Sequence, residues 1–275
     1  MSNLVERGRS QRRACEALQL QRSSLRYEAQ PEDPVNELIR EALLELAQRF
    51  QRWGSPRMSW WLGSEYGINH KRVERQYNKL GLQLPRKRPK KKHGGPVQRR
   101  VVEASGRNQI WTLDFVHDLT ELKQKLKILT VLDEGTRECL EIRAEKRMRS
   151  RDVVETLDEL VTERGAPGYL RMDNGPEFIA AELHEWARDH NIQILHIEPG
   201  SPWENGYIES FNGKFRDECL NVELFWSRAE AQVVVDWYRH VYNWQRPHRA
   251  LKGKPPAIAV GELKPVKPQT GVELN

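Results

Sequence analysis

The 275-residue sequence predicts an α/β protein, a mixed five-stranded sheet with flanking helices, preceded by a small all-α region. Two observations predict this class. Apolar residues recur at helical spacing before a basic, proline-containing stretch at 85–100, and they alternate at strand spacing after it. The later segments then follow the order three strands, helix, strand, helix, strand, helix. We expect a helical region at 1–84, a basic linker at 85–107, an α/β core at 108–222 and a C-terminal helix and tail at 223–275.

The helical region is expected to hold three main helices between about 37 and 82, after a weaker helical signal at 11–27. The first, at 37–50, has an apolar stripe at Leu38, Leu43, Leu46 and Phe50. The second runs from Pro56 to Tyr66. The third begins after Asn69, an N-cap residue, and stops at Gly81. Two helices joined by a glycine-containing turn are typical of a DNA-binding helix-turn-helix.

Positive charge is concentrated in the N-terminal third. The net charge is +6, yet residues 85–100 alone carry eight Lys or Arg and no acid, whereas 101–275 carry 23 against 29. This distribution predicts a nucleic-acid partner. The DNA-contacting residues expected in this part are Lys71, Arg72, Arg75 and Lys79 on the third helix and Arg86, Lys87, Arg88, Lys90, Lys91 and Lys92 in the linker. A solvated helix face and a solvated spacer remain the alternatives.

Composition excludes several other classes of protein. Mean hydropathy is −0.77, and no apolar run approaches the ~18 residues of a membrane helix. The N-terminus lacks the apolar segment of a secretory signal, so we expect a cytoplasmic protein. Cys15, Cys139 and Cys219 are odd in number and widely spaced, which predicts packed, reduced thiols without a zinc knuckle or a disulfide framework.

The core begins with three strands at 108–116, 126–133 and 138–144, joined by short turns. A helix capped at Ser150, a strand at 168–173, a helix from about 179 to 190 and a strand at 192–197 follow. This order is that of a ribonuclease-H-like fold.

The next helix has a defined register, because Ser201, Pro202 and Glu204 form a capping-box pattern. Its core stripe is Ile208, Phe211, Phe215 and Cys219, and its polar stripe is Asn205, Glu209, Asn212 and Arg216. A second box, from Ser227 to Glu230, predicts a terminal helix that reaches Asn243.

Three carboxylates are the candidate catalytic and metal-binding groups. Asp114 lies within the first strand, Asp173 closes the fourth, and Glu209 is on the polar stripe of the capped helix. Neighbouring first and fourth strands would bring the three acids together, and their mutual repulsion would be relieved by Mg²⁺ or Mn²⁺. Two such ions can assist phosphoryl transfer. Taken singly, each acid is also compatible with an ordinary surface or turn position.

Other polar residues are weaker candidates. His117 and His196 could act as general bases, although structural roles are simpler, and Asp118 and Asp133 lie near strand ends without a partner pattern.

The strings WTLDFVHD, RMDNGPEF, EPGSPWENGYIESFNGKFRDECLN and YNWQRPHRAL closely resemble OrfB transposases of bacterial insertion sequences, in the retroviral integrase superfamily. In that family an Asp, an Asp and a Glu spaced by 35 residues form the catalytic triad, and 35 residues separate Asp173 from Glu209. The resemblance covers nearly the whole chain, including the helix-turn-helix segment. It departs only at Leu251–Gly253, where a Leu-Gly pair is more usual.

The resemblance implies DNA cleavage and strand transfer by two Mg²⁺ ions, with Asp114 bridging both and Asp173 and Glu209 each holding one. Further DNA-contacting residues expected in the core are Asn205, Lys214, Arg216, Arg246 and His248, with covering of the surface as the alternative for the last two. Expected partners are the insertion-sequence ends, a target DNA, an upstream OrfA joined by frameshift, and further copies on DNA.

Two other functions remain possible from the sequence. A DNA-binding regulator with a degenerate core would be favoured by loss of one acid, and all three are present. A ribonuclease-H-type nuclease would not need the basic helical arm that precedes this core.

Overall fold

The structure is a computed structural model that describes residues 10–19, 21, 23, 31–85, 102–197 and 205–261. The chain forms two compact units, Met1–Ala42 and Leu43–Asn275. The linker cations from Arg86 to Lys92 and the capping box at Ser201 lie outside the described residues. Within the described ranges, no helix is both long and apolar enough to cross a membrane.

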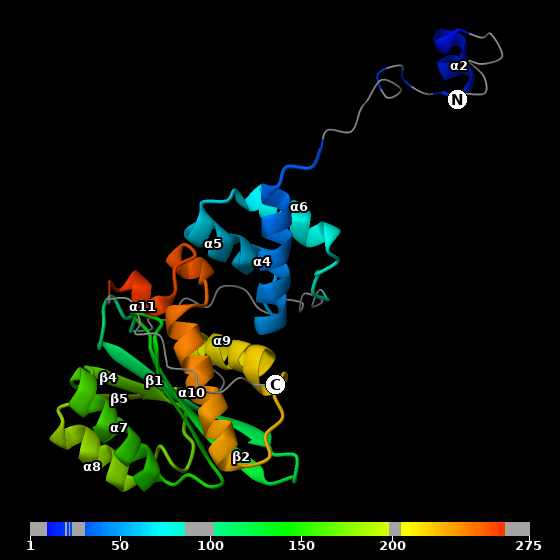
Figure 1. The fold of residues 1–275 in the computed structure, drawn as a ribbon. Coiled ribbons are helices and arrows are strands. Elements are labelled where there is room, and N and C mark those ends of the chain that lie inside the picture. The colour runs from blue at the N-terminus through cyan, green and yellow to red at the C-terminus, as the bar shows by residue number, and fades with distance from the viewer. Residues whose placement is uncertain are drawn as a thin grey trace. The chain divides into compact units, whose positions relative to one another are not determined.

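The N-terminal elements are helices α2 (Gln11–Ala17), α4 (Val35–Arg49), α5 (Ser55–Tyr66) and α6 (His70–Lys79) (Figure 1). The predicted stripe on the first long helix is wrong at one position. Ile39 is buried, whereas Leu38 is 63% exposed. Ile39 lies four residues before Leu43, a spacing that keeps the two side chains on one face of the helix, whereas Leu38 lies five residues before Leu43 and points away from that face.

The turn between α5 and α6 has the expected chemistry. Gly67 has φ of 65° and its N–H donates to the Gly63 carbonyl oxygen, which ends α5. The Asn69 side chain accepts a hydrogen bond from Lys71 N at 2.9 Å and begins α6. On α6 the buried residues include Val73 and Tyr77. The helix-turn-helix prediction is therefore confirmed.

The five predicted strands are present as β1 (Ile110–Leu119), β2 (Lys125–Asp133), β3 (Cys139–Glu145), β4 (Tyr169–Met172) and β5 (Gln193–His196). Their order in the sheet is β3-β2-β1-β4-β5. β1, β2 and β3 pair antiparallel, whereas β4 pairs parallel with β1 and with β5. The parallel pairs require crossover connections, which are helices α7 (Ser150–Arg164) and α8 (Ala181–Asp189). The predicted fold class is confirmed.

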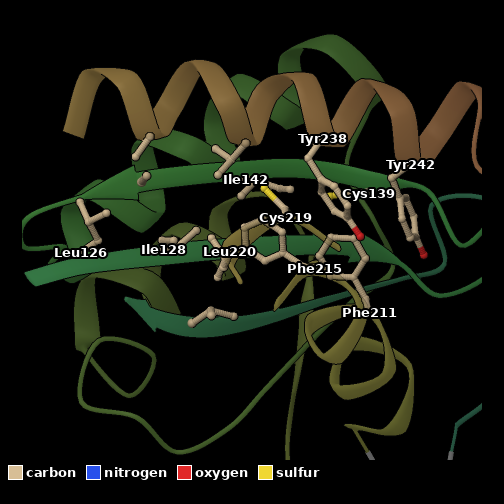
Figure 2. Packing of buried hydrophobic residues seen from close by; sticks show 14 of the residues in the cluster. Leu126, Ile128, Cys139, Ile142, Phe211, Phe215, Cys219, Leu220, Tyr238 and Tyr242 are labelled. Carbon is tan, nitrogen blue, oxygen red and sulfur yellow. The ribbon is translucent and has the colours of Figure 1, made fainter. Parts of the chain in front are cut away.

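Each face of the sheet carries its own hydrophobic core. Residues of α7 and α8 pack on one face with Trp111, Leu113 and Leu170. On the other face lie α9 (Gly206–Phe215), its π-helical continuation η2 (Arg216–Leu220) and α10 (Arg228–Trp244). Figure 2 shows Phe211 and Phe215 of α9 meeting Tyr238 and Tyr242 of α10 over β2 and β3. The predicted core stripe from Ile208 to Cys219 is thus buried throughout.

The helix ends depart little from expectation. α7 starts at Ser150, but its N-cap is Arg149, whose N–H donates to Asp152 Oδ2 at 2.7 Å. Ser227 caps α10 as predicted, accepting from Glu230 N at 3.1 Å. A 3₁₀ turn, η3 (Arg249–Leu251), and a short helix, α11 (Pro256–Ala259), follow. All three cysteines are free and buried.

Candidate active site

The alternation of β1 separates apolar from polar residues. Trp111 and Leu113 are buried under α7 and α8, so Thr112 and Asp114 point to the face covered by α9. Thr112 is level with Arg171 of the parallel strand β4. The pairing of the two strands ends there, and two residues further on lie Asp114 of β1 and Asp173, which directly follows β4.

Two side-chain hydrogen bonds attach α9 to β1. Thr112 Oγ1 donates to Asn205 Oδ1 at 2.8 Å, and Asn212 Nδ2 donates to Asp114 Oδ2 at 2.8 Å. Glu209 lies between Asn205 and Asn212 at positions i, i+4 and i+7, which share one helix face. Its exposed carboxylate is thereby placed on the side of α9 that runs along β1.

A third bond fixes the direction of this helix. Arg216 Nη2 donates to the His117 carbonyl oxygen at 2.8 Å, one step further along both elements. The predicted polar stripe therefore follows β1 in register. α9 packs against β1 and β2.

Asn212 is oriented by a residue that the sequence analysis missed. Thr130 of β2 pairs with Asp114 in the sheet register. Its Oγ1 lies 3.0 Å from Asn212 Oδ1 and 3.1 Å from the Asp114 main-chain oxygen. Because the amide oxygen faces a hydroxyl, the amide nitrogen faces the Asp114 carboxylate. The register of the β1–β2 hairpin was the signal that could have identified Thr130.

The Asp114 carboxyl is half-buried, and burial is the main reason why its pKa is raised. Hydrogen bonds from Phe115 N at 2.7 Å and from Asn212 lower this pKa, whereas the negative charges of Asp173 and Glu209 raise it. The charges of Asp173 and Glu209 thus oppose ionisation of Asp114.

The loop after β4 is anchored beside Asp114. Asp173 Oδ1 accepts from Gly175 N at 2.9 Å. Phe178 is fully buried and stacks on Phe115 with ring centroids 4.9 Å apart. A Cβ on Gly175 would lie 3.0 Å from Asp173 Oδ1, so this close turn favours glycine.

The three acids offer carboxylate oxygens, the ligands that Mg²⁺ and Mn²⁺ prefer. The hydrogen-bond partners of Asp114 are neutral. The two charged residues that affect its pKa, Asp173 and Glu209, are both negative. A divalent cation therefore fits the chemistry of this donor set. In the described part of the chain, no three His, Cys, Asp or Glu side chains are grouped closely enough to form a metal cage.

The core residues predicted to contact DNA fall into different positions. Arg216 is exposed, and Lys214 Nζ donates to Ser210 Oγ at 2.6 Å. Asn205 is buried on Thr112 and therefore positions α9. On α6, Lys71, Arg75 and Lys79 are exposed and Arg72 is half-buried.

Arg246 and His248 require a correction. Arg246 is 2% exposed, and its guanidinium holds both oxygens of Glu218 at 2.6 and 2.8 Å. His248 is buried against Tyr242, and burial lowers the pKa of its imidazole to about 3. An interior salt bridge and a neutral, buried imidazole leave no surface for a DNA phosphate, so the prediction that these two residues contact DNA is wrong.

Among the weaker candidates, Asp133 has a structural role. Asp133 is fully buried and accepts hydrogen bonds from the main-chain N–H groups of Asn108, Gly135 and Thr136, so it organises the turn after β2. His117 and His196 are exposed.

Comparison with known proteins identifies the family. Models described as "Integrase core domain" match residues 104–202 and 190–256, and one described as "HTH-like domain" matches 34–90. The "Insertion element IS476 uncharacterized 39.2 kDa protein" of Xanthomonas euvesicatoria is 39% identical over 97% of this chain and 77% of its own length. The transposase for insertion sequence element IS904 of Lactococcus lactis is 26% identical over 68% of this chain and 79% of its own length.

A solved structure agrees with the fold. A chain of the simian T-cell lymphotropic virus intasome, determined in complex with PP2A regulatory subunit B56 gamma, aligns with a TM-score of 0.51. It is 15% identical and covers 83% of this chain and 78% of its own. The sequence relatives and the matched family models together establish the family. The chain belongs to the insertion-sequence transposases of the retroviral integrase superfamily.

Proposed function

We propose that this transposase cleaves the ends of an insertion sequence and joins the freed 3′-hydroxyl to another strand, using Asp114, Asp173 and Glu209 with divalent metal ions. The supporting observation is the half-buried Asp114, which interacts electrostatically with Asp173, the residue directly after β4, and is hydrogen-bonded to Asn212 on the α9 face that carries Glu209. Asp114 would bind two ions, and each of the other acids would hold one.

When bound, the ions would stabilise negative charge on the attacking and leaving oxygens of the phosphoryl transfer. The chain itself positions the acids. Hydrogen bonds from Asn212 and Phe115 N–H favour the ionised form of the Asp114 carboxylate, and Gly175 N–H orients Asp173.

Divalent metal should stabilise the fold through Asp114. The pKa of Asp114 is raised in the folded state, so its ionised carboxylate lowers the free energy of unfolding once the pH exceeds the folded pKa. This destabilisation disappears below the unfolded pKa of ~3.9. We expect Mg²⁺ at pH 7 to raise the melting temperature, since a ligand that binds only the native state stabilises it. Asp114→Asn should melt higher than the wild type without metal and show a smaller Mg²⁺ shift.

The matched control is Asp118→Asn, on the same strand, whose Oδ1 contacts only the adjacent Leu119 N–H in the described structure. It should retain the full wild-type Mg²⁺ shift. An equal shift in Asp114→Asn and wild type would remove Asp114 from the proposed metal site.

DNA is proposed to be held by the exposed cations of α6 and by the linker. The slope of log K for DNA binding against the logarithm of salt concentration is about 0.9 in magnitude for each phosphate that the protein neutralises. Replacing Lys71, Arg75 and Lys79 with Gln should lower that slope by about 3. Neutralising the linker from Arg86 to Arg100 should flatten it further.

The control for this titration is Arg151→Gln, an exposed cation on α7 with an i, i+4 partner. It should leave the slope unchanged. If the linker variant also retains the wild-type slope, the arm does not touch DNA.

An upstream OrfA is proposed as the partner of this chain, which would act as an oligomer on DNA in the cytoplasm and associate with the nucleoid. The sequence contains no sustained heptad run, and two element ends have to be held together. Alone, the chain should bind DNA mainly through charge and cut poorly.

The test compares the chain with an OrfA fusion in a strand-joining assay on end-sequence duplexes at matched salt. The fusion should join strands faster and select the correct ends. Equal rates and equal end selectivity would show that the chain needs no OrfA.

A further inference from the structure

One buried carboxylate, Glu218, joins three parts of the chain. It lies on η2, which continues α9 directly, and its side chain is 5% exposed. Arg246, after α10, holds it at 2.6 and 2.8 Å. Arg57 of α5 approaches the same carboxylate, with Nη1 3.0 Å from Oε1. Two guanidinium groups therefore share one acid that is shielded from water.

A neighbouring ion pair reinforces this contact. Arg52 Nη2 lies 2.8 Å from Asp217 Oδ1, the residue before Glu218. Arg57 Nη1 also donates to the Arg52 carbonyl oxygen at 3.1 Å. The start of α5 is thus attached to consecutive residues of η2.

Apolar contacts lie beside the ionic ones. Phe50 stacks on Trp53 at 3.9 Å and faces Trp237 of α10, with ring centroids 6.4 Å apart. Gly253 packs on Trp60 of α5, where a Cβ would lie 2.8 Å from the ring, and its φ is +85°. A side chain at residue 253 would therefore strain the backbone and force the Trp60 ring to move.

The charges around Glu218 explain why its pairing with the two arginines matters. Burial is the main cause that lowers the pKa of Arg57, followed by repulsion from Arg246. Burial and the charge of Arg246 also keep His248 neutral. Without the Glu218 charge, two arginines would face each other in a poorly solvated site.

We propose that Glu218 is a positioning residue that fixes the α5–α6 pair to the active-site helix α9. Glu209 and Glu218 lie nine residues apart along one helical run, so a contact at Glu218 is transmitted through continuous backbone to Glu209. On the proposed function, this contact keeps DNA that is bound to α6 at a fixed distance from the three acids. Arg246, which belongs to the YNWQRPH segment, supports this contact because its guanidinium binds Glu218.

The test measures a distance between α6 and the core. The natural cysteines are buried, and burial raises the pKa of the Cys139 and Cys219 thiols, so introduced exposed cysteines can be spin-labelled selectively. Labels at Glu74→Cys on α6 and Glu185→Cys on α8 should give one narrow distance distribution. Arg57→Ala should increase the width of this distance distribution at least twofold.

Arg57→Ala leaves the Arg246–Glu218 pair intact, so it tests the contact without the risk that replacing Glu218 itself prevents folding. The distance distribution of Arg57→Lys, which keeps a positive charge, should remain narrow. The distribution of the control variant Glu155→Gln, at an exposed ion pair on α7, should also remain narrow. A wild-type distribution in Arg57→Ala would overturn the proposal.

A second measurement separates this proposal from the proposed function. Arg57→Ala should keep DNA affinity within threefold and lower strand joining at least tenfold, with recovery in Arg57→Lys. If the wild type joins no strands although the distances change as expected, the proposed function fails and the positioning role stands. If Arg57→Ala joins strands at the wild-type rate, the positioning role fails and the proposed function stands.

Discussion

Asp114→Asn should abolish strand cleavage and joining while leaving DNA affinity within about twofold of the wild type. The amide keeps the shape of the carboxyl but lacks the negative charge and one acceptor oxygen that a divalent ion needs. Loss of a residue that only supports a metal ligand costs about 10–100-fold, so loss of a ligand should exceed about 100-fold. DNA affinity should persist because the proposed binding cations lie on α6 and in the linker.

The measurement is cleavage and joining of a labelled end duplex, with DNA binding recorded at the same salt. Asp118→Asn, four residues along β1, is the matched control and should retain activity. Activity within threefold of the wild type in Asp114→Asn would refute the proposed triad.

Glu134→Gln should lower the free energy of unfolding by about 3–5 kcal/mol, because it breaks a buried ion pair by removing one charge. Glu134 is fully buried, and both of its oxygens accept from Arg171 Nη1 at 2.7 Å. Burial raises the pKa of Glu134, and Arg171 opposes that rise. Arg171 lies on β4, two residues before Asp173, so its loss of a partner should also disturb the active site.

Urea unfolding with a fixed spectroscopic signal measures this effect. The control is Glu155→Gln at the exposed pair with Arg151, which should change stability by less than about 1 kcal/mol. Replacing both buried partners, as Glu134→Leu with Arg171→Met, should recover most of the loss. A loss below about 1 kcal/mol in Glu134→Gln would show that Arg171 finds another partner.

Local patterns in the sequence were enough to predict the strands, the helix-turn-helix and the helix that carries Glu209. Each depends on residues within one or two turns of one another. Ser227 capping Glu230 N–H is an example, as is the stripe that places Asn205, Glu209 and Asn212 on one face. On the first long helix the predicted stripe included Leu38, whereas the spacing of four residues to Leu43 favours Ile39, and Ile39 is the buried residue.

By itself, the sequence determined the fold class, the two N-terminal helices that flank a glycine turn, and the choice of Asp114, Asp173 and Glu209 as candidates. The tertiary structure alone decided that Arg246 is an interior partner of Glu218, 28 residues away, instead of a DNA contact. The reason is physical: helical and strand periodicity is written in neighbouring residues, whereas burial and ion pairing depend on which distant segments the fold brings together.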